Sequence, residues 1–350
     1  MKYRPLGNTG LTVSAVGYGA LGSPTSTPEL IQLAVEGGIT YFDTARKYKG
    51  SEMKIGMALK GLDRGKLILS SKSQARAPAP FLDEFSESMK LLGTEYLDIL
   101  FTHDVSTPEN WKQIRDSGVI DAMRQLKLQG RIRHLGCSTH DSAVGREIIE
   151  SGSFEVVMLA YNAANPELED TLIPLAKDRG LGVIGMKPLG GGVLTDQRSR
   201  ELGFEVSAAE ALRFALSNPG IDSVIPGLDT AEYVQTALNA LHGHTPITPE
   251  ERRELLGRVT IRGRNYCRGC GYCQPCPEGV AIVEILKLYN RWEIYNRADW
   301  AQMHLIRTEF ARTVPMANGP EVCIKCNACT VKCPYNLPIP ELMEASKEMR

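Results

Sequence analysis

Two runs of closely spaced cysteines near the C-terminal end contain eight of the nine cysteines in this sequence. The first run is Cys267, Cys270, Cys273 and Cys276, and the second is Cys323, Cys326, Cys329 and Cys333. Three thiolates at two-residue spacing can wrap one iron–sulfur cube, and a fourth cysteine that the following proline turns away can reach a second cube. This pattern predicts two [4Fe–4S] clusters and therefore one-electron chemistry.

The two runs differ in one detail that affects which cysteines share a cluster. The second run fits C-x2-C-x2-C-x3-C-P, whereas the first is one residue shorter before its last cysteine. Both resemble the runs of a bacterial ferredoxin with two [4Fe–4S] clusters. Zinc is the alternative, although zinc sites usually pair CxxC units across a longer gap. The shorter gap leaves open whether Cys276 ligates its own cluster. We predict crossed ligation, with Cys333 completing the first-run cluster and Cys276 the second-run cluster.

Four polar groups upstream stand where predicted β-strands end. Asp43 ends one apolar run and Tyr48 follows in its loop, while Lys72 and His103 end the next two runs. A tyrosine with the reference pKa near 10 holds its proton too tightly to be a good donor at neutral pH. A nearby ammonium lowers that pKa, an aspartate can orient the ammonium, and a neutral histidine can bind a substrate oxygen. The four groups together predict a site for general-acid catalysis.

The elements that must position these groups alternate along residues 10–245. The expected strands are 13–19, 40–45, 66–71, 96–102, 132–138, 155–161, 182–187 and 222–226. The expected helices are 28–37, 51–60, 80–92, 108–129, 141–151, 168–179, 207–217 and 230–242. Several strands are continuous apolar runs, which is typical of parallel strands buried on both faces. Eight β–α units predict a (β/α)8 barrel, whose active residues lie at the C-terminal strand ends. A doubly wound sheet is the alternative, but the glycines near the first strand open no helix.

Over residues 1–245 the chain resembles the aldo-keto reductase family. The resemblance is carried by the N-terminal Tyr3-Arg-Pro-Leu-Gly-Asn-Thr-Gly, Phe42-Asp-Thr-Ala-x-x-Tyr48, Gly50-Ser-Glu52, Lys72, His103, Gly136-Cys-Ser138, Tyr161-Asn162, Pro188-Leu-Gly-Gly-Gly192 and Ile225-Pro-Gly227. It implies NAD(P)H-dependent carbonyl reduction or its reverse, with the family's catalytic tetrad at Asp43, Tyr48, Lys72 and His103. The whole chain is similar to the subgroup with a C-terminal ferredoxin-like domain.

The resemblance also implies cofactor contacts. They are expected at Ser138, Leu189, Gly190, Gly191 and Gly227; the glycines can let backbone N–H groups approach a pyrophosphate. Other family positions differ here. Thr139 replaces the family's asparagine, and Met158 replaces its glutamine. Met186 replaces the tyrosine that stacks on nicotinamide in the family. The basic pair that grips a 2′-phosphate aligns with Gly227 and Tyr233, so no preference for NADPH is expected.

Composition and segment boundaries complete the expectations. The expected division is a barrel over 1–250, a helical linker over 251–262 and a ferredoxin-like domain over 263–350. The last domain carries an insert over 278–322 with two helical stretches, whose aromatic residues are expected to form a core. The formal net charge of −1 and the lack of a basic stripe argue against nucleic acid as a partner. Because the sequence has no apolar run of about eighteen residues, no membrane-spanning helix is expected. No signal peptide is expected either. The clustered free thiols suggest a reducing compartment, and the cytoplasm is the expected location.

These observations predict an oxidoreductase that moves hydride between NAD(P)H and a small carbonyl or alcohol substrate. Two alternatives remain at this stage. In one, a ferredoxin-like redox partner feeds electrons through the clusters and nicotinamide is not used. In the other, the clusters serve only structure or docking.

Overall fold

The computed structural model describes residues 1–20, 25–164, 166–192, 194–202, 205–240, 247–262, 267, 273–295, 300–333 and 337–349. Contacts within the chain divide it into two compact units, Met1–Gly190 with Ala208–Arg252, and Gly191–Ser207 with Arg253–Arg350. The domain boundaries expected from composition stay a prediction.

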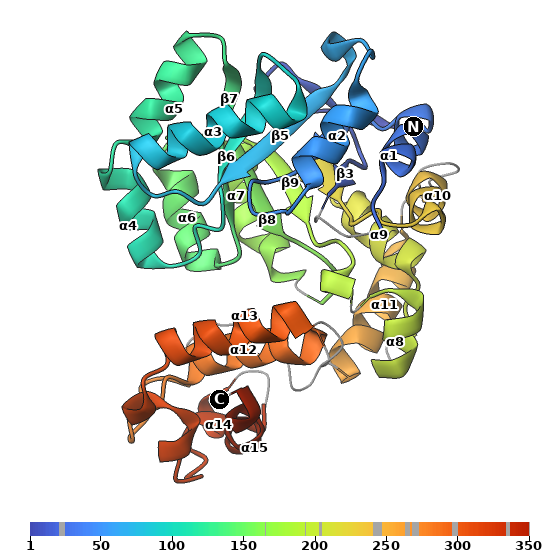
Figure 1. Ribbon diagram of the computed structural model, residues 1–350. Coiled ribbons are helices and arrows are strands. Elements are labelled where there is room, and N and C mark those ends of the chain that lie inside the picture. Colours follow the sequence, from blue (N-terminus) through green and yellow to red (C-terminus); the bar gives the residue numbers. More distant parts are fainter. Residues whose placement is uncertain are drawn as a thin grey trace. The chain divides into compact units, whose positions relative to one another are not determined.

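The first unit is built on a parallel sheet that curls into a nearly closed barrel (Figure 1). Its strands are β3 (Tyr18–Gly19), β4 (Tyr41–Asp43), β5 (Ile68–Ser73), β6 (Leu97–Thr102), β7 (Ile132–Thr139), β8 (Val156–Ala160), β9 (Gly182–Met186) and β10 (Ser223–Ile225). Each strand pairs in parallel with the next. Parallel bridges from Val16 to Val224 and from Gly19 to Gly227 join the two edges. The predicted barrel is therefore confirmed.

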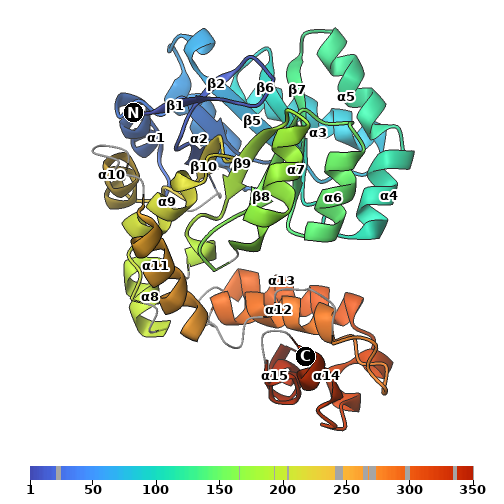
Figure 2. The same ribbon diagram turned by 180° about the vertical axis from the view of Figure 1, so that it is seen from behind.

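Helices follow the strands and lie on the outside of the barrel, as Figures 1 and 2 show. They are α1 (Pro28–Glu36), α2 (Ser51–Leu59), α3 (Pro78–Leu92), α4 (Pro108–Asp116), α5 (Val119–Leu128), α6 (Ser142–Glu150), α7 (Leu172–Asp178), α9 (Ala208–Ser217) and α10 (Ala231–Asn239). Their start signals are local. Thr27, Thr107 and Asp141 each accept a hydrogen bond from a main-chain N–H of the first turn. These caps satisfy main-chain donors of the first turn and so fix where each helix begins.

Two predicted elements were wrong in detail. The strand expected over 13–19 is two strands, because β2 (Thr12–Ser14) pairs antiparallel with β1 (Tyr3–Pro5), and only β3 joins the barrel. The single helix expected over 108–129 is two helices, α4 and α5. Between them Gly118 has a φ of 87°, in the left-handed region that glycine tolerates. Both errors come from contacts or dihedrals that an apolar pattern does not encode.

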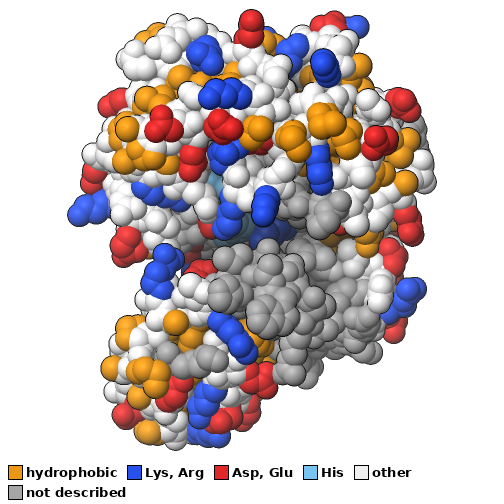
Figure 3. Space-filling model, in the orientation of Figure 1, with side chains coloured by type: hydrophobic (Ala, Val, Ile, Leu, Met, Phe, Trp, Pro, Cys, Tyr) orange, Lys and Arg blue, Asp and Glu red, His pale blue; other side chains and the backbone are white. Residues whose placement is uncertain are grey.

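The barrel is filled by a cluster of inward-facing apolar side chains. Its buried members are Leu6, Val13, Tyr41, Ile68, Ile99, Phe101, Val156, Met158, Ile184, Met186 and Ile225. Six of the eight barrel strands contribute to this cluster, so the barrel interior is a packed core rather than a channel. On the face shown in Figure 3, acidic and basic side chains are interspersed.

The second unit is helical and surrounds the cysteines. It contains α8 (Asp196–Leu202), most of α11 (Pro249–Arg262), α12 (Ile282–Tyr295), α13 (Trp300–Thr313), α14 (Ala328–Lys332) and α15 (Ile339–Ser346). The two helices predicted in the insert are α12 and α13. Trp292 and Phe310 are buried with Cys267, Cys273 and Cys333 in one apolar cluster, which confirms that these aromatics form a core. Within the described ranges, no helix is long and apolar enough to cross a membrane.

Candidate functional site

A buried ion pair links the ends of two neighbouring barrel strands. Asp43 ends β4, and Lys72 lies near the end of β5. The Lys72 ammonium donates to the Asp43 carboxylate and, at 2.9 Å, to the carbonyl oxygen of Thr44. Ser70 Oγ donates to the other Asp43 oxygen at 2.6 Å. The side chains of Asp43 and Lys72 are only 3% and 2% exposed, so this pair is shielded from water.

Burial acts on both members of the pair. It raises the pKa of Asp43 and lowers the pKa of Lys72, because taking either charge out of water is unfavourable. In both groups the opposite charge and the hydrogen bonds shift the pKa in the direction opposite to the effect of burial. The ammonium is therefore held in place by a partner whose loss would leave a charge buried alone.

Tyr48 and His103 lie beside this ion pair. The Lys72 Nζ atom is 5.3 Å from the centroid of the Tyr48 ring. The Tyr48 and His103 rings meet edge to face, with centroids 5.5 Å apart and planes at 88°. The structure thus brings the four residues predicted at successive strand ends to one place. Their catalytic roles stay a prediction.

His103 is buried and held by its main chain. Its N–H donates to Ser73 O at 2.8 Å, and Arg76 Nη2 donates to its carbonyl oxygen at 2.6 Å. Burial, and then the positive charge of Lys72, lowers the pKa of His103, so the imidazole is neutral at physiological pH. Its Nδ1 atom is buried and lacks a hydrogen-bond partner within the described part of the chain. A buried ring nitrogen without a partner suits a group that binds a ligand oxygen.

Sequence reasoning gave no role to Glu52, which fixes the loop that carries Tyr48. Glu52 is buried, accepts a hydrogen bond from Ser71 Oγ at 2.6 Å and forms an ion pair with Arg46. The Arg46 N–H also donates to Lys72 O at 3.0 Å. The loop between Asp43 and Tyr48 is therefore tied to β5 by both main chain and side chains. The Gly-Ser-Glu motif was the available signal, but spacing alone did not reveal this contact.

The predicted nicotinamide contacts lie at the ends of β7, β9 and β10. Ser138 is buried next to Met158 in the strand register, and its Oγ accepts a hydrogen bond from Asp104 N at 2.9 Å. Leu189 is buried after β9, and Gly190 and Gly191 follow it with φ values of 61° and 70°. Gly227 follows β10 and bridges to Gly19. These residues occupy the expected strand ends, and their cofactor contacts stay a prediction.

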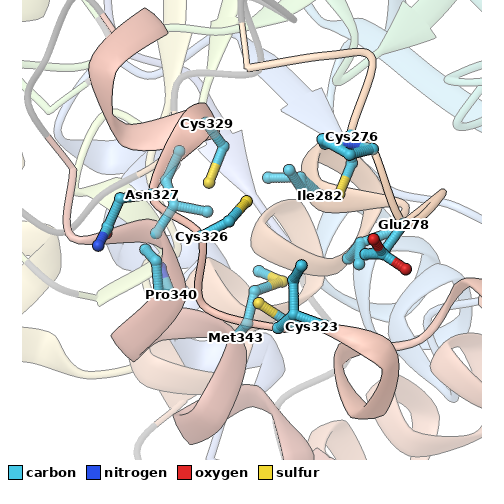
Figure 4. A pocket seen from close by; sticks show the side chains of 13 residues that line it. Cys276, Glu278, Ile282, Cys323, Cys326, Asn327, Cys329, Pro340 and Met343 are labelled. Carbon is cyan, nitrogen blue, oxygen red and sulfur yellow. The ribbon is translucent and has the colours of Figure 1, made fainter.

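Cysteines from both runs line one cavity in the second unit. Cys276 of the first run faces it together with Cys323, Cys326 and Cys329 of the second run (Figure 4). The rest of its lining includes Ile282, Ile339 and Met343. These four thiols are the set that crossed ligation assigns to one cluster. The cavity therefore places Cys276 with the second run, as the crossed arrangement requires.

Three further cysteines are buried in the apolar core of this unit. Cys267, Cys273 and Cys333 are all buried in the same apolar cluster. Cys270, the fourth predicted member of this set, lies outside the described residues. Cys276, Cys323 and Cys329 pack against the same cluster. The assignment of Cys333 to the first-run cluster therefore stays a prediction.

The spacing of the thiols fits a cluster better than a single ion. Among the described residues, no three Cys, His, Asp or Glu side chains stand close enough to hold one metal ion. Zinc draws its ligands to about 2.3 Å around a point, whereas a cube of iron and sulfide needs thiolates around a wider space. In the described part of the chain, Cys276 and three second-run cysteines line a cavity rather than meet at one point.

Comparisons with known proteins agree with both halves of the structure. Residues 15–209, more than half of the chain, match the aldo/keto reductase family, and residues 266–337 match a 4Fe-4S dicluster domain. The chain is 29% identical over 234 residues to an NADH-specific methylglyoxal reductase of Escherichia coli, covering 57% of this chain and 71% of the relative. It is 30% identical over 284 residues to L-galactose dehydrogenase of Arabidopsis thaliana, covering 69% and 88%.

A solved structure shows the same relationship. An aldo-keto reductase from Bacillus halodurans in its holo form superposes with a TM-score of 0.64 and 25% sequence identity. The match covers 74% of this chain and 96% of that chain. The barrel, the converging strand ends and the cysteine-lined cavity lead to one conclusion: this chain belongs to the aldo/keto reductase family and carries a C-terminal 4Fe-4S dicluster domain.

Proposed function

We propose that this oxidoreductase moves hydride between NAD(P)H and a small carbonyl or alcohol substrate in its barrel, and electrons through two C-terminal [4Fe–4S] clusters. The observation that carries the barrel proposal is the buried Lys72–Asp43 ion pair with the Tyr48 and His103 rings beside it. One group there can donate a proton, one can stabilise the anion left behind, and one can bind an oxygen.

Each side chain has a separate task. Neutral His103 binds the substrate oxygen through a ring nitrogen and orients the carbonyl. Tyr48 gives its hydroxyl proton to that oxygen as negative charge develops there. The Lys72 ammonium stabilises the phenolate that remains, and Asp43 holds the ammonium in position. Solvent then returns a proton to Tyr48. In the oxidative direction the same groups act in reverse.

Nicotinamide fits part of this site. Within the described residues, the Nδ1 atom of His103 is buried without a hydrogen-bond partner beside the Tyr48 ring, as a ligand-binding group would be. Ser138 at the end of β7 would hold the carboxamide, and the glycines after β9 would lie against the pyrophosphate. A bound reduced nicotinamide supplies the hydride that the carbonyl carbon accepts. Met186, where a stacking tyrosine was expected, offers apolar contact without a ring.

The names of the relatives narrow the substrate class. One is called a methylglyoxal reductase and the other an L-galactose dehydrogenase. Both names describe small, polar carbonyl or hydroxyl compounds. We therefore place the substrate of this chain among small oxygenated carbonyls or their alcohols.

In the second unit we propose crossed ligation. Cys267, Cys270, Cys273 and Cys333 would hold one cluster, and Cys276, Cys323, Cys326 and Cys329 the other. The cavity shared by Cys276 and the second run supports the second set. The first set then consists of the four cysteines that remain in the two runs. The clusters supply one-electron transfer when present.

The deciding experiment combines iron and sulfide analysis of anaerobically purified protein with calorimetric titration of NADH and NADPH. About eight irons per chain and binding of a reduced nicotinamide support the proposal. Hydride transfer is then followed with a panel of small carbonyls by loss of nicotinamide absorbance. Binding of neither nicotinamide would remove the hydride-transfer proposal.

A second candidate is a nicotinamide-independent reductase that receives electrons from a ferredoxin-like partner. The methionines at Met158 and Met186 favour it, because neither side chain donates a hydrogen bond to a nicotinamide. Here the carbonyl would take up two electrons, which the partner supplies and the clusters pass on one at a time, and two protons, the first from Tyr48 and the second from solvent. Reduction of substrate by a chemically reduced ferredoxin, without nicotinamide, is the test. If removing the clusters leaves turnover unchanged, they serve structure or docking.

A further inference from the structure

A buried side-chain amide on the insert holds the first cysteine of the first run. Asn290 lies on α12 and is 7% exposed. Its Nδ2 donates to Cys267 O at 2.6 Å, and its Oδ1 accepts from Cys267 N at 3.1 Å. One amide thus pairs with both main-chain groups of one cysteine, as a neighbouring β-strand would.

A second amide holds the last cysteine of the same run. Gln274 Oε1 accepts from Cys276 N at 3.0 Å, and Gln274 Nε2 donates to Val280 O at 3.1 Å. The side chain therefore ties Cys276 to the start of the insert. The two amides act at opposite ends of the first run. In the crossed arrangement Cys267 and Cys276 belong to different clusters.

We propose that Asn290 and Gln274 are positioning residues, each for one cluster: Asn290 for the cluster of Cys267 and Cys333, and Gln274 for the cluster of Cys276 and Cys326. This inference rests on the proposed pair of clusters. Neither amide ligates iron. Each fixes the main chain of one ligand, and so sets where its thiolate points and how well the folded chain retains the cluster.

The insert thereby acquires a function. Asn290 comes from the middle of α12, whose buried face includes Leu286 and Trp292. Packing of α12 in the core therefore determines where the amide stands. The helical insert is the scaffold that presents the Cys267 backbone to its cluster, rather than a spacer between two cysteine runs.

The test uses the full chain, purified anaerobically, with four variants. Asn290→Leu and Gln274→Leu each remove one amide at similar size. Asn290→Asp keeps an acceptor for Cys267 N but loses the donor to Cys267 O, and is used if Asn290→Leu fails to fold. Ser346→Ala is the matched control, because Ser346 is a buried polar residue of this unit whose hydroxyl, within the described part of the chain, donates to Met343 O of its own helix.

The readouts are iron per chain, the EPR spectrum of the reduced clusters and their two midpoint potentials. Asn290→Leu should lose about half of the iron, or shift one potential while the other stays. Gln274→Leu should do the same to the other cluster, and Ser346→Ala should match the parent. Asn290→Asp should make its cluster harder to reduce, because it adds a negative charge nearby.

Backgrounds with one ligand removed assign each effect. In Cys333→Ala, which lacks one cluster, Asn290→Leu should cause no further iron loss, whereas in Cys326→Ala it should remove the rest. Gln274→Leu should show the opposite pattern. Amide variants with parental iron, spectra and potentials would overturn the inference, as would effects of both on the same cluster. A parent chain without two clusters would instead overturn the cluster proposal, and the two failures are thus distinct.

Discussion

Cys276 faces the same cavity as Cys326, although the two belong to different cysteine runs. The chain between them includes α12 and α13, and it folds back so that the end of the first run meets the second. A ligand set drawn from both runs makes each cluster a cross-link between them. Loss of either run should therefore affect both clusters.

The crossed ligand sets can be tested by combining alanine variants. The triple replacement of Cys323, Cys326 and Cys329 should leave about four irons per chain. Adding Cys276→Ala should remove no more iron, because that ligand already lacks its cluster. Adding Cys333→Ala should remove the remainder. Iron analysis of anaerobic samples decides, and the reverse order of effects would show that each run binds its own cluster.

Replacing Tyr48 by Phe should abolish carbonyl reduction and leave nicotinamide binding nearly unchanged. The hydroxyl is needed only while charge develops on the substrate oxygen, and the ring contact with His103 is kept. A loss of at least a hundredfold in kcat, with cofactor affinity within about twofold, is expected. Turnover within tenfold of the parent on a verified carbonyl substrate would contradict the assignment.

Breaking the Lys72–Asp43 pair should cost stability as well as activity. Lys72→Met leaves the Asp43 carboxylate buried without its counter-charge, which typically destabilises by about 3–5 kcal/mol. The double replacement with Asp43→Asn should recover part of that loss. Arg115→Ala, which removes an exposed ion pair with Asp116, is the control and should cost less than about 1 kcal/mol. Denaturant unfolding measures the free energy of unfolding of all three variants. Equal losses of stability from breaking the buried pair and the exposed pair would refute the argument.

Acid should destabilise the folded chain through His103. Burial and the charge of Lys72 lower its pKa, so the folded state holds the neutral ring while the unfolded chain binds a proton below about pH 6.5. The stability from this residue is present above that pH and is lost as the pH falls, by up to about 1.4 kcal/mol per pH unit. Between pH 8 and pH 5, the free energy of unfolding should therefore fall more steeply with decreasing pH for the parent than for His103→Asn. The same pH dependence in both proteins would show that the His103 ring does not cause this effect.

If nicotinamide binds, NADPH should have little or no advantage over NADH. A 2′-phosphate carries nearly two negative charges and is normally held by Arg or Lys. The loop after β10 offers the acids Asp229 and Glu232, and like charge there should disfavour the phosphate by about 1 kcal/mol or more. Glu232→Lys, at an exposed site in the first turn of α10, should shift the preference toward NADPH.

Calorimetry with both forms measures that preference. Hundredfold tighter binding of NADPH to the parent would mean that the phosphate lies elsewhere. Binding of neither form would favour the ferredoxin-driven candidate.

Much of the fold was predictable because its signals are local. Apolar runs of strand length gave every barrel strand, and helical patterns gave the helix starts within a few residues; in the structure Thr107 and Asp141 cap two of those starts. The two elements that were predicted wrongly depend on features that an apolar pattern does not contain. Pairing of β2 with β1 is a contact between segments, and the break at Gly118 depends on one backbone dihedral. Neither changes the apolar pattern that the sequence displays.

The sequence by itself determined the chemical groups and their order: eight clustered thiols, and Asp43, Tyr48, Lys72 and His103 at successive strand ends. In a parallel barrel, strand ends must converge, so spacing along the chain was enough. The tertiary structure decided which groups touch. It placed Cys276 with the second run, tied Glu52 to Ser71, and buried His103 so that its ring stays neutral. Those outcomes depend on long-range packing and on exclusion of water, which arise only when distant segments come together.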